Sequence, residues 1–430
     1  MDVDVLVAGA GIGGLTTALA LHRAGIRARL VEAAAELRPI GVGINLLPHA
    51  VEELTVLGLG DALAQVAVPT AEMAHFDRHG NRIWSEPRGL AQGHRRPQYS
   101  LHRGELQALL YEAVRDRLGA DAVRTGTALD GFEEHAEDAD GLRVTLRSTT
   151  TGARTTERAE ALVGADGLHS RVRALLHPGE QRLPLWNGVR MWRGTVRAEP
   201  FLGGRTMAVV GSNATAKLVV YPISRRAEER GEALLNWVCE VRVAEGGPVE
   251  GAAWNRTGRL ADVLAHYADW KLDRLGLDVP ALLAATEEIL EYPMADRDPL
   301  ESWGRGRVTL LGDAAHPMYP IGSNGGSQAV LDARALARAL TSAASVPSAL
   351  RAYESERAPL TGDLVRAMRE MPADRLLQAV AERAPDGFER VEDVLTVDEL
   401  ASIDAAYRRT SGPGDAGAGP ARGGHRPRRT

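Results

Sequence analysis

The residues best suited to chemistry begin with a glycine-rich stretch, GAGIGG, at residues 9–14. It follows an apolar, β-branched segment, residues 2–8, and opens a segment of helical spacing, residues 12–24. A helix that starts on glycine leaves its first backbone N–H groups free, and such groups bind phosphate. The stretch therefore predicts a phosphate-binding turn between a strand and a helix.

Glycine spacing and one acidic residue make that turn typical of a dinucleotide site. In the G-x-G-x-x-G pattern Gly9 permits the tight turn, Gly11 lets a pyrophosphate approach the backbone, and Gly14 allows the helix to pack on the strand. Glu32 ends the next predicted strand, residues 26–32, where its carboxylate can accept hydrogen bonds from ribose hydroxyls. The pattern does not separate NAD from FAD, and a tight turn without a ligand is the alternative.

A second glycine-rich stretch, GDAAHPMYPIGSNGG, occupies residues 312–326. Asp313 directly follows the apolar run RVTLL, so its carboxylate stands at the end of a predicted strand, where it can hold a ribose or ribityl hydroxyl. Gly322, Gly325 and Gly326 then leave N–H groups free just before the next helical segment. An Asx-turn followed by a proline-rich loop is the alternative interpretation.

A third stretch, GADGLHSRVR at residues 164–173, again places a carboxylate, Asp166, between a predicted strand and a helix start. One ligand explains three such crossings more simply than three ligands do. Unlike a nicotinamide cofactor, FAD carries a tricyclic ring that needs its own seat, and the second stretch can be that seat. A helix N-terminus there would stabilise the negative charge that reduction places on the ring. We therefore predict FAD as the cofactor.

The elements around these stretches predict an α/β protein. We expect a Rossmann-like FAD-binding domain, an inserted antiparallel β-sheet domain for the substrate, and C-terminal helices. The predicted boundaries assign the FAD-binding domain to residues 1–71, 98–181 and, with the C-terminal helices, 300–400, the substrate domain to a hairpin at 72–97 and to 182–299, and a disordered Gly/Pro-rich tail to 408–430.

Composition narrows the class of protein. Hydrophobic residues make up 44 % and charged residues 25 % of the chain, and the net charge of −6 excludes a basic nucleic-acid surface over its body. The single cysteine, Cys239, excludes an internal disulfide framework and a zinc–thiolate cluster, and we expect no metal site. We find neither an apolar run that could span a membrane nor a signal-peptide pattern, so we expect a cytoplasmic monomer or homodimer.

Together the three stretches resemble those of the single-component FAD-dependent aromatic hydroxylases, the family of para-hydroxybenzoate hydroxylase. Further stretches are similar to 5-methylphenazine-1-carboxylate 1-monooxygenase and its relatives, among them GVGINLLPHAVEELTVLGLG, MWRGTV and DRDPLESWGRGRVTLLGDAAH. The resemblance covers residues 1 to about 370. It implies the α/β fold described above and a flavin-dependent oxygenation.

The resemblance also implies which residues contact FAD. Arg103 would approach the phosphate and ribityl region, Asp166 would support the pyrophosphate, and Asp313 would hold the ribityl chain. Pro320 and Gly322 would form the catalytic backbone around flavin C4a, with no side chain acting as a base. The full set of expected FAD contacts is Gly9, Gly11, Ile12, Gly13, Gly14, Glu32, Arg38, Gly43, Arg103, Asp166, Asp313, Pro320, Gly322, Asn324 and Gly325.

The reaction that the resemblance implies uses NADH or NADPH as co-substrate and dioxygen as oxidant. The reduced flavin would form a C4a-hydroperoxide, which hydroxylates a planar aromatic or N-heteroaromatic substrate such as a phenazine carboxylate, with or without decarboxylation, in secondary metabolism or aromatic breakdown. Because the cofactor carries this chemistry, no Ser-His-Asp or metal-ligand constellation is needed. We accordingly interpret His316 as a packing residue.

Aromatic or soft side chains on the predicted sheet are candidates for the substrate wall. They are Trp192, Met207, Tyr221, Trp237, Tyr292 and Tyr319, and packing within the core is the alternative for each. Para-hydroxybenzoate hydroxylase clamps its carboxylate with a Ser-x-Arg pair, whereas here Ser212 has no such arginine after it. This departure from the family pattern favours a different heteroaromatic ring.

Two other functions stay open at the level of sequence. One keeps the fold and the flavin but oxygenates a non-aromatic olefin or ketone, as an epoxidase or a Baeyer–Villiger-type oxygenase would. The other is a flavin-binding protein that has lost turnover.

Overall fold

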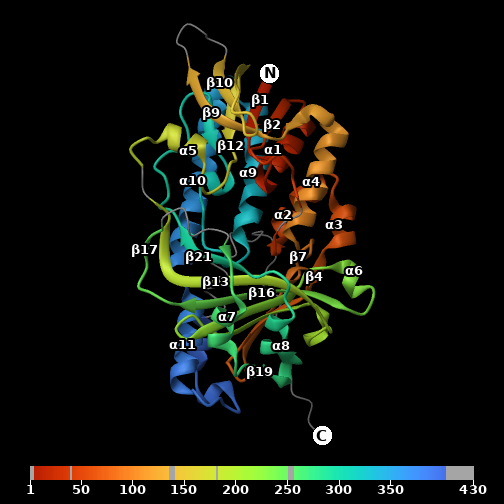
Figure 1. Cartoon of the computed structure of the whole chain (residues 1–430), viewed down its shortest axis with the longest axis vertical. Coiled ribbons are helices and arrows are strands. Elements are labelled where there is room, and N and C mark those ends of the chain that lie inside the picture. The colour runs from red at the N-terminus through yellow and green to blue at the C-terminus, as the bar shows by residue number, and fades with distance from the viewer. Residues whose placement is uncertain (1–3, 39–40, 135–140, 181–182, 250–255, 403–430) are drawn as a thin grey trace.

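The computed structural model describes residues 4–38, 41–134, 141–180, 183–249 and 256–402. In Figure 1 the region that contains β1 (Asp4–Ala8) lies at the top, and a broad sheet crosses the middle of the molecule. The predicted tail at 408–430 lies outside the described residues. Within them, no helix is both long enough and apolar enough to span a membrane.

The upper region is built on a five-stranded parallel sheet. Its central strand β1 is completely buried from Val5 to Val7, as expected where helices cover both faces of a parallel sheet. The strand order is β22-β12-β1-β2-β8, with β2 at Arg27–Val31, β8 at Val123–Arg124, β12 at Ala161–Gly164 and β22 at Val308–Leu310. The glycine–carboxylate stretches follow β1, β12 and β22, which are neighbours, so their C-terminal ends meet at one edge.

Helices pack around this sheet and share one hydrophobic core with it. Helix α9 (Asn324–Ser342) contacts α1 (Ile12–Arg23), α2 (Pro48–Val56) and α10 (Val346–Arg369), while α4 (Arg103–Leu118) packs on α1. The other elements of this region are α3 (Gly60–Val66), α5 (Arg171–Leu176) and the three-stranded sheet of β9 (Thr127–Glu134), β10 (Leu142–Ser148) and β11 (Arg154–Ala159).

The second region is a nine-stranded sheet of order β18-β21-β13-β16-β15-β14-β5-β6, with β17 beside β13. Its strands are β5 (Glu72–Phe76), β6 (Arg82–Pro87), β13 (Leu185–Ala198), β14 (Thr206–Ser212), β15 (Ala216–Pro222), β16 (Ala233–Arg242), β17 (Gly247–Pro248), β18 (Arg256–Thr257) and β21 (Leu290–Asp296). The hairpin expected at 72–97 thus joins this sheet.

The prediction of a purely antiparallel sheet needs one correction. Strand β14 pairs with β5 in parallel, whereas the other neighbours pair antiparallel, so the sheet is mixed. The reason is the chain's path: β5 arrives from an early hairpin rather than by a tight turn from β14, and a parallel pair requires such a long connection.

Both faces of the large sheet are covered. One face packs on α7 (Leu260–Tyr267) and α8 (Val279–Ala284), which lie below the sheet in Figure 1. The other face carries Met207 and Tyr221 and packs on α11 (Pro372–Arg383). Two small sheets complete the fold, one of β3 (Gly43–Leu46), β4 (Val68–Thr70) and β7 (Gln98–His102), the other of β19 (Lys271–Leu272) and β20 (Leu277–Asp278).

Candidate active site

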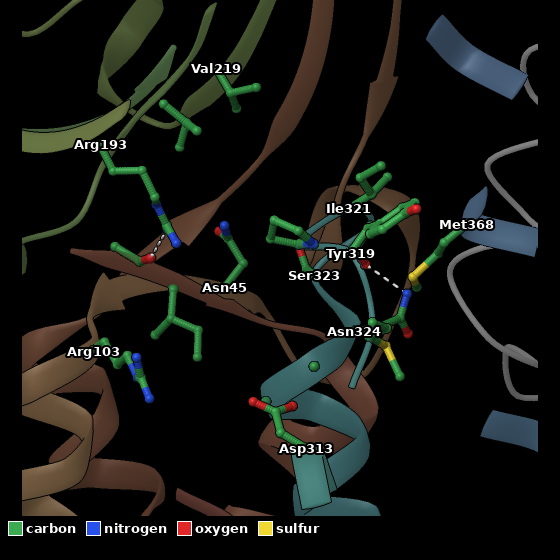
Figure 2. A pocket seen from close by; sticks show the side chains of 18 of the residues that line it. Asn45, Arg103, Arg193, Val219, Asp313, Tyr319, Ile321, Ser323, Asn324 and Met368 are labelled. Atoms are coloured by element: carbon green, nitrogen blue, oxygen red, sulfur yellow. Dashed lines mark hydrogen bonds between the residues drawn. The ribbon is translucent and has the colours of Figure 1, made fainter. Parts of the chain in front are cut away.

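A cavity of about 390 Å³ lies where the C-terminal edge of the parallel sheet meets the large sheet. Figure 2 shows Arg193 and Val219 from the large sheet at the top of the cavity, and Arg103 and Asp313 at the bottom. The loop that contains Tyr319 closes one side. The cavity therefore joins the predicted flavin seat to the predicted substrate wall.

The first glycine turn has room for a pyrophosphate. A Cβ atom on Gly14 would lie 2.0 Å from the carbonyl oxygen of Gly9, and one on Gly9, whose φ is +104°, would lie 2.4 Å from that of Ala165. A Cβ on Gly11 would meet no protein atom within 4 Å, and Gly11 lines the cavity. Gly9 and Gly14 thus allow the close packing of the turn, and Gly11 leaves its backbone open to a ligand.

The carboxylate of Glu32 fixes this turn from the neighbouring strand. It accepts hydrogen bonds from the backbone N–H of Ala10 at 2.8 Å and of Ala34 at 2.8 Å. A carboxylate has about four acceptor positions, so two remain for the ribose hydroxyls that the sequence assigns to it.

The second glycine turn presents Asp313 to the cavity. The Asp313 side chain is exposed, although its neighbours Gly312 and Ala314 are buried. The sequence predicts that Gly325 lies just before a helix. Helix α9 begins at Asn324, so Gly325 instead lies inside its first turn. Ser323 precedes the helix at a φ of +62°, a conformation that costs a non-glycine residue about 1 kcal/mol or more and is found mainly at functional sites.

Two buried charged residues that the sequence analysis missed hold the second turn in place. Arg173, from α5, donates to the carbonyl oxygens of Ala314 and Ala315, both at 3.1 Å. Asp332, from α9, accepts from the backbone N–H of Gly312 at 3.1 Å. Their only signal in the sequence is a charge within an apolar helical pattern.

The Asp332 carboxylate also contacts a histidine ring and an arginine. Its carboxylate lies 2.6 Å from Nε2 of His316 and accepts from Nε of Arg357 at 2.7 Å. Burial by itself would raise the pKa of Asp332, but His316 and Arg357 outweigh burial and hold that pKa at about 2. His316 is 3 % exposed and packs on Trp303, so it lies behind the turn, away from the cavity.

The predicted FAD contacts do not all reach the cavity. Ten line it: Gly11, Ile12, Gly13, Gly43, Arg103, Asp313, Pro320, Gly322, Asn324 and Gly325. Asp166 instead caps α5, where its carboxylate accepts from Ser170 Oγ at 2.5 Å and from the Arg171 N–H at 2.7 Å. Arg38 is exposed and pairs with Glu36 at 2.9 Å, outside the cavity lining, because the loop carries it to the surface.

The predicted substrate wall divides between the faces of the large sheet. Met207, Tyr221 and Tyr319 line the cavity. Trp192 and Trp237 are buried on the opposite face, because side chains alternate along a strand and their neighbours Arg193 and Val238 take the cavity side. For these two tryptophans the core-packing alternative describes the structure.

Tyr292 also lies outside the cavity lining. It is half-buried and packs in the small cluster that contains Met191, Met294 and Tyr319. Tyr292 therefore packs within this cluster, where burial raises its pKa and the nearby charges of Arg193 and Arg103 oppose that rise.

Polar side chains on the cavity face were missed by the sequence analysis. Arg193 donates to the carbonyl oxygen of Gly43 at 2.9 Å, and Lys217, Glu240 and Asp374 stand together further along the wall. A lysine inside the apolar strand AKLVVYP was the available signal. Burial raises the pKa of the Tyr221 hydroxyl on this face, against the opposing effect of Arg193.

Comparison with known proteins places this geometry in a family. A family profile described as "FAD binding domain" matches residues 2–250 and 273–368. The chain is 49 % identical over 409 residues to phenazine 1,6-dicarboxylic acid hydroxylase PhzS of Lysobacter antibioticus, covering 95 % of this chain and 97 % of the relative. It is 34 % identical to aurachin C monooxygenase/isomerase of Stigmatella aurantiaca, over 84 % of this chain and 87 % of that one.

A solved structure is similar over nearly the whole length. Klebsiella pneumoniae HpxO complexed with FAD and uric acid has a TM-score of 0.74 and 26 % identity, with 96 % of this chain and 97 % of that chain covered. The parallel sheet, the large sheet and the C-terminal helices thus recur in a flavoprotein of known structure. The matches show that this protein belongs to the FAD-dependent aromatic hydroxylases and is an FAD-dependent aromatic monooxygenase.

Proposed function

We propose that this monooxygenase hydroxylates a phenazine carboxylate. The observation that carries the proposal is its 49 % identity, over nearly the full length of both chains, to a phenazine 1,6-dicarboxylic acid hydroxylase. The cavity supports it, because an aromatic and apolar wall of Met207, Val219 and Tyr221 faces the flavin seat and suits a planar ring system. The resemblance of several sequence stretches to 5-methylphenazine-1-carboxylate 1-monooxygenase is also part of this proposal.

Bound FAD, once reduced by NADH or NADPH, activates dioxygen for transfer of one oxygen atom to the ring. The chain's own residues bind and orient. The backbone at Gly11 receives the pyrophosphate, Asp313 holds a hydroxyl of the ribityl chain, and the first turn of α9 faces the flavin edge with its free N–H groups. Arg103, at the start of α4, supplies positive charge near the phosphates.

Residues of the large sheet and the loop at 318–322 position the ring and exclude water. Tyr319 is buried and packs on the cluster that contains Met191 and Val238, which fixes the loop that carries Pro320 beside the cavity. Water exclusion protects the activated oxygen from unproductive loss, and orientation brings the ring carbon to it. No side chain is required to act as a base in this arrangement.

The test is rapid-mixing absorbance of the purified holoenzyme with NADH or NADPH, with and without phenazine-1-carboxylate or phenazine-1,6-dicarboxylate. We expect one of these acids to accelerate flavin reduction strongly and to yield a ring-hydroxylated product that carries one atom of oxygen-18 from labelled dioxygen. Flavin reduction that no aromatic acid accelerates would count against the proposal and would favour an oxygenase of non-aromatic substrates. The same experiment decides between NADH and NADPH and detects decarboxylation. The cytoplasmic location and the monomeric or homodimeric state stay predictions.

A further inference from the structure

Three charged side chains meet on the cavity wall of the large sheet. Lys217 on β15 and Glu240 on β16 are register partners, with 2.7 Å between Nζ and a carboxylate oxygen. Asp374 comes from α11, and its carboxylate lies 2.9 Å from the same Nζ. Lys217 is only 5 % exposed, yet all three residues line the cavity.

The cluster carries more negative than positive charge. One ammonium group faces two carboxylates in a buried site, where each unbalanced charge is costly. Burial raises the pKa of Glu240, and the nearby Asp374 adds to that effect, while Lys217 opposes it. A third carboxylate could enter such a site only if one of the two acids left its place.

The two acids differ in how firmly they are held. Glu240 is the eighth residue of the ten-residue strand β16 and is paired on both sides, with Met191 of β13 and Lys217 of β15. Asp374 lies in the first turn of α11, which follows a sharp break after α10 where Met371 has a φ of +43°. Asp374 is also the more exposed, with 14 % of its side chain accessible against 6 % for Glu240. Asp374 is therefore the acid that can be displaced.

We propose that Lys217 anchors a carboxylate of the substrate and that Asp374 occupies the position of that carboxylate until the ligand binds. This inference rests on the proposed function and adds the residue that recognises the carboxylate of the substrate. The incoming carboxylate replaces Asp374 beside Lys217, so the charge of the cluster does not change, and no bond is made or broken.

The spacing of the wall shows which carboxylate is recognised. Lys217, Val219 and Tyr221 share the cavity face of β15, and four residues of extended chain span about 13 Å. Tyr221 lies at the end near Arg193 and Gly43, whose β3 strand borders the flavin seat. Lys217 thus binds a carboxylate at the end of the ring system that is remote from the flavin, and the reacting end lies near Tyr221.

The test measures dissociation constants of phenazine-1,6-dicarboxylate and of unsubstituted phenazine for oxidised holoenzyme, by quenching of flavin fluorescence. Lys217→Met should weaken the dicarboxylate by at least about tenfold and leave phenazine within about twofold, because only the acid loses a buried ionic partner. Lys217→Arg should restore most of the preference. Asp374→Asn should tighten the dicarboxylate severalfold, because the competing carboxylate is gone. Arg375→Gln, on the exposed side of α11, is the matched control and should change neither constant.

A purely structural cluster predicts the opposite pattern. In that case Lys217→Met and Asp374→Asn would both weaken the two ligands equally, and the proposal would be overturned. If Lys217→Met does not yield holoenzyme, Asp374→Asn decides, since tighter binding of the dicarboxylate supports exchange and weaker binding contradicts it. Product analysis of the wild-type enzyme tests the proposed function independently of the role of Lys217. Lys217-dependent binding without hydroxylation would reject the proposed function alone, and hydroxylation with an unchanged KM in Lys217→Met would reject the anchor alone.

Discussion

The two ends of the cavity bind by different means. At the predicted cofactor end many of the groups that line the cavity are backbone atoms of short turns, at Gly11, Gly322 and Gly325, which lie at or near helix starts. At the substrate end they are side chains, and Lys217 meets an acid 157 residues away. The glycine turns of the cofactor end are therefore sensitive to an added Cβ atom, whereas the substrate end can change its ligand through single side chains.

The largest effect is expected from a methyl group in the first glycine turn. Gly14→Ala places a Cβ 2.0 Å from the carbonyl oxygen of Gly9, so the turn must shift, and the protein should purify without flavin. Gly11→Ala meets no protein atom, so the fold should persist while the dissociation constant for FAD rises by about tenfold or more, because the methyl group lies where the pyrophosphate approaches.

Flavin absorbance per protein and circular dichroism distinguish these two results. Gly131→Ala in β9 is a suitable control, since its Cβ would also lie in open space but far from the cavity lining, and FAD affinity should stay within about twofold. Full flavin content in Gly14→Ala would contradict the account of this turn.

Asp332→Asn should be the most damaging side-chain change at the cofactor end. It leaves Arg357 buried without its carboxylate partner and weakens the hold on Gly312, so the free energy of unfolding should fall by about 3 kcal/mol. Urea unfolding followed by circular dichroism measures it. The control is Glu53→Gln, which breaks a half-exposed ion pair with Arg334 and should cost less than about 1 kcal/mol. Equal losses in the two variants would refute the distinction.

The two ends should also differ in their response to acid. Burial, helped by the charges of Arg88 and Lys217, lowers the pKa of His75, on β5 beside the substrate wall, to about 3 from 6.5. Between these values the unfolded chain binds one proton more than the folded chain, so stability falls as pH drops, by up to about 1.4 kcal/mol per pH unit. His75→Gln should flatten this slope, and an unchanged slope would be the contrary result.

Asp332, at the cofactor end, changes stability in the same direction as His75 but at lower pH. Its pKa is lowered to about 2 from 3.8, so the stability it contributes is complete above pH 3.8 and is lost only as pH falls toward 2. The free energy of unfolding, measured from pH 7 to pH 4, should therefore show the pH dependence caused by His75 and not that caused by Asp332. A loss of the His75 slope in Asp332→Asn would contradict this separation.

The smallest effect tests the two faces of the large sheet. Met207→Ala enlarges the cavity and should weaken a bound aromatic acid by about threefold to tenfold. Because Met207 is buried, this variant should also lose about 2 kcal/mol or more of stability. Trp192→Phe should leave ligand affinity within about twofold but cost about 1–2 kcal/mol of stability, because it removes the hydrogen bond from Trp192 Nε1 to Glu291. Ligand titration and urea unfolding of both variants test this assignment of the two faces. Weaker ligand binding in Trp192→Phe with unchanged binding in Met207→Ala would contradict it.

Much of the cofactor end could be predicted because its signals are local. Glycine is required at positions 9 and 14 by the space around each backbone, and the sequence shows both. Asp313 follows the buried strand β22 as predicted, and its side chain is exposed. For Arg38 a surface position was the alternative, since a basic residue in a loop carries no information about the direction of its side chain, and here it turns to Glu36, outside the cavity lining.

The substrate end could not be predicted in the same way, because both faces of the large sheet are buried. Alternation along a strand reveals which face is inside only when the other face is polar, and β13 carries Met191 and Trp192 on opposite faces, each packed on helices or loops. The sequence therefore named the right strands but could not separate Trp192 and Trp237 from Met207 and Tyr221.

By itself, then, the sequence indicated the family and the flavin and predicted the three turns expected to hold it, because a backbone that must do without Cβ atoms records that need residue by residue. Only the tertiary structure decided the rest of the site. Parallel strands had to align β1, β12 and β22 before their turns could share one ligand, and α11 had to fold across the large sheet before Asp374 could meet Lys217. Contacts between residues so distant in sequence depend on how the layers pack, which no single stretch of residues encodes.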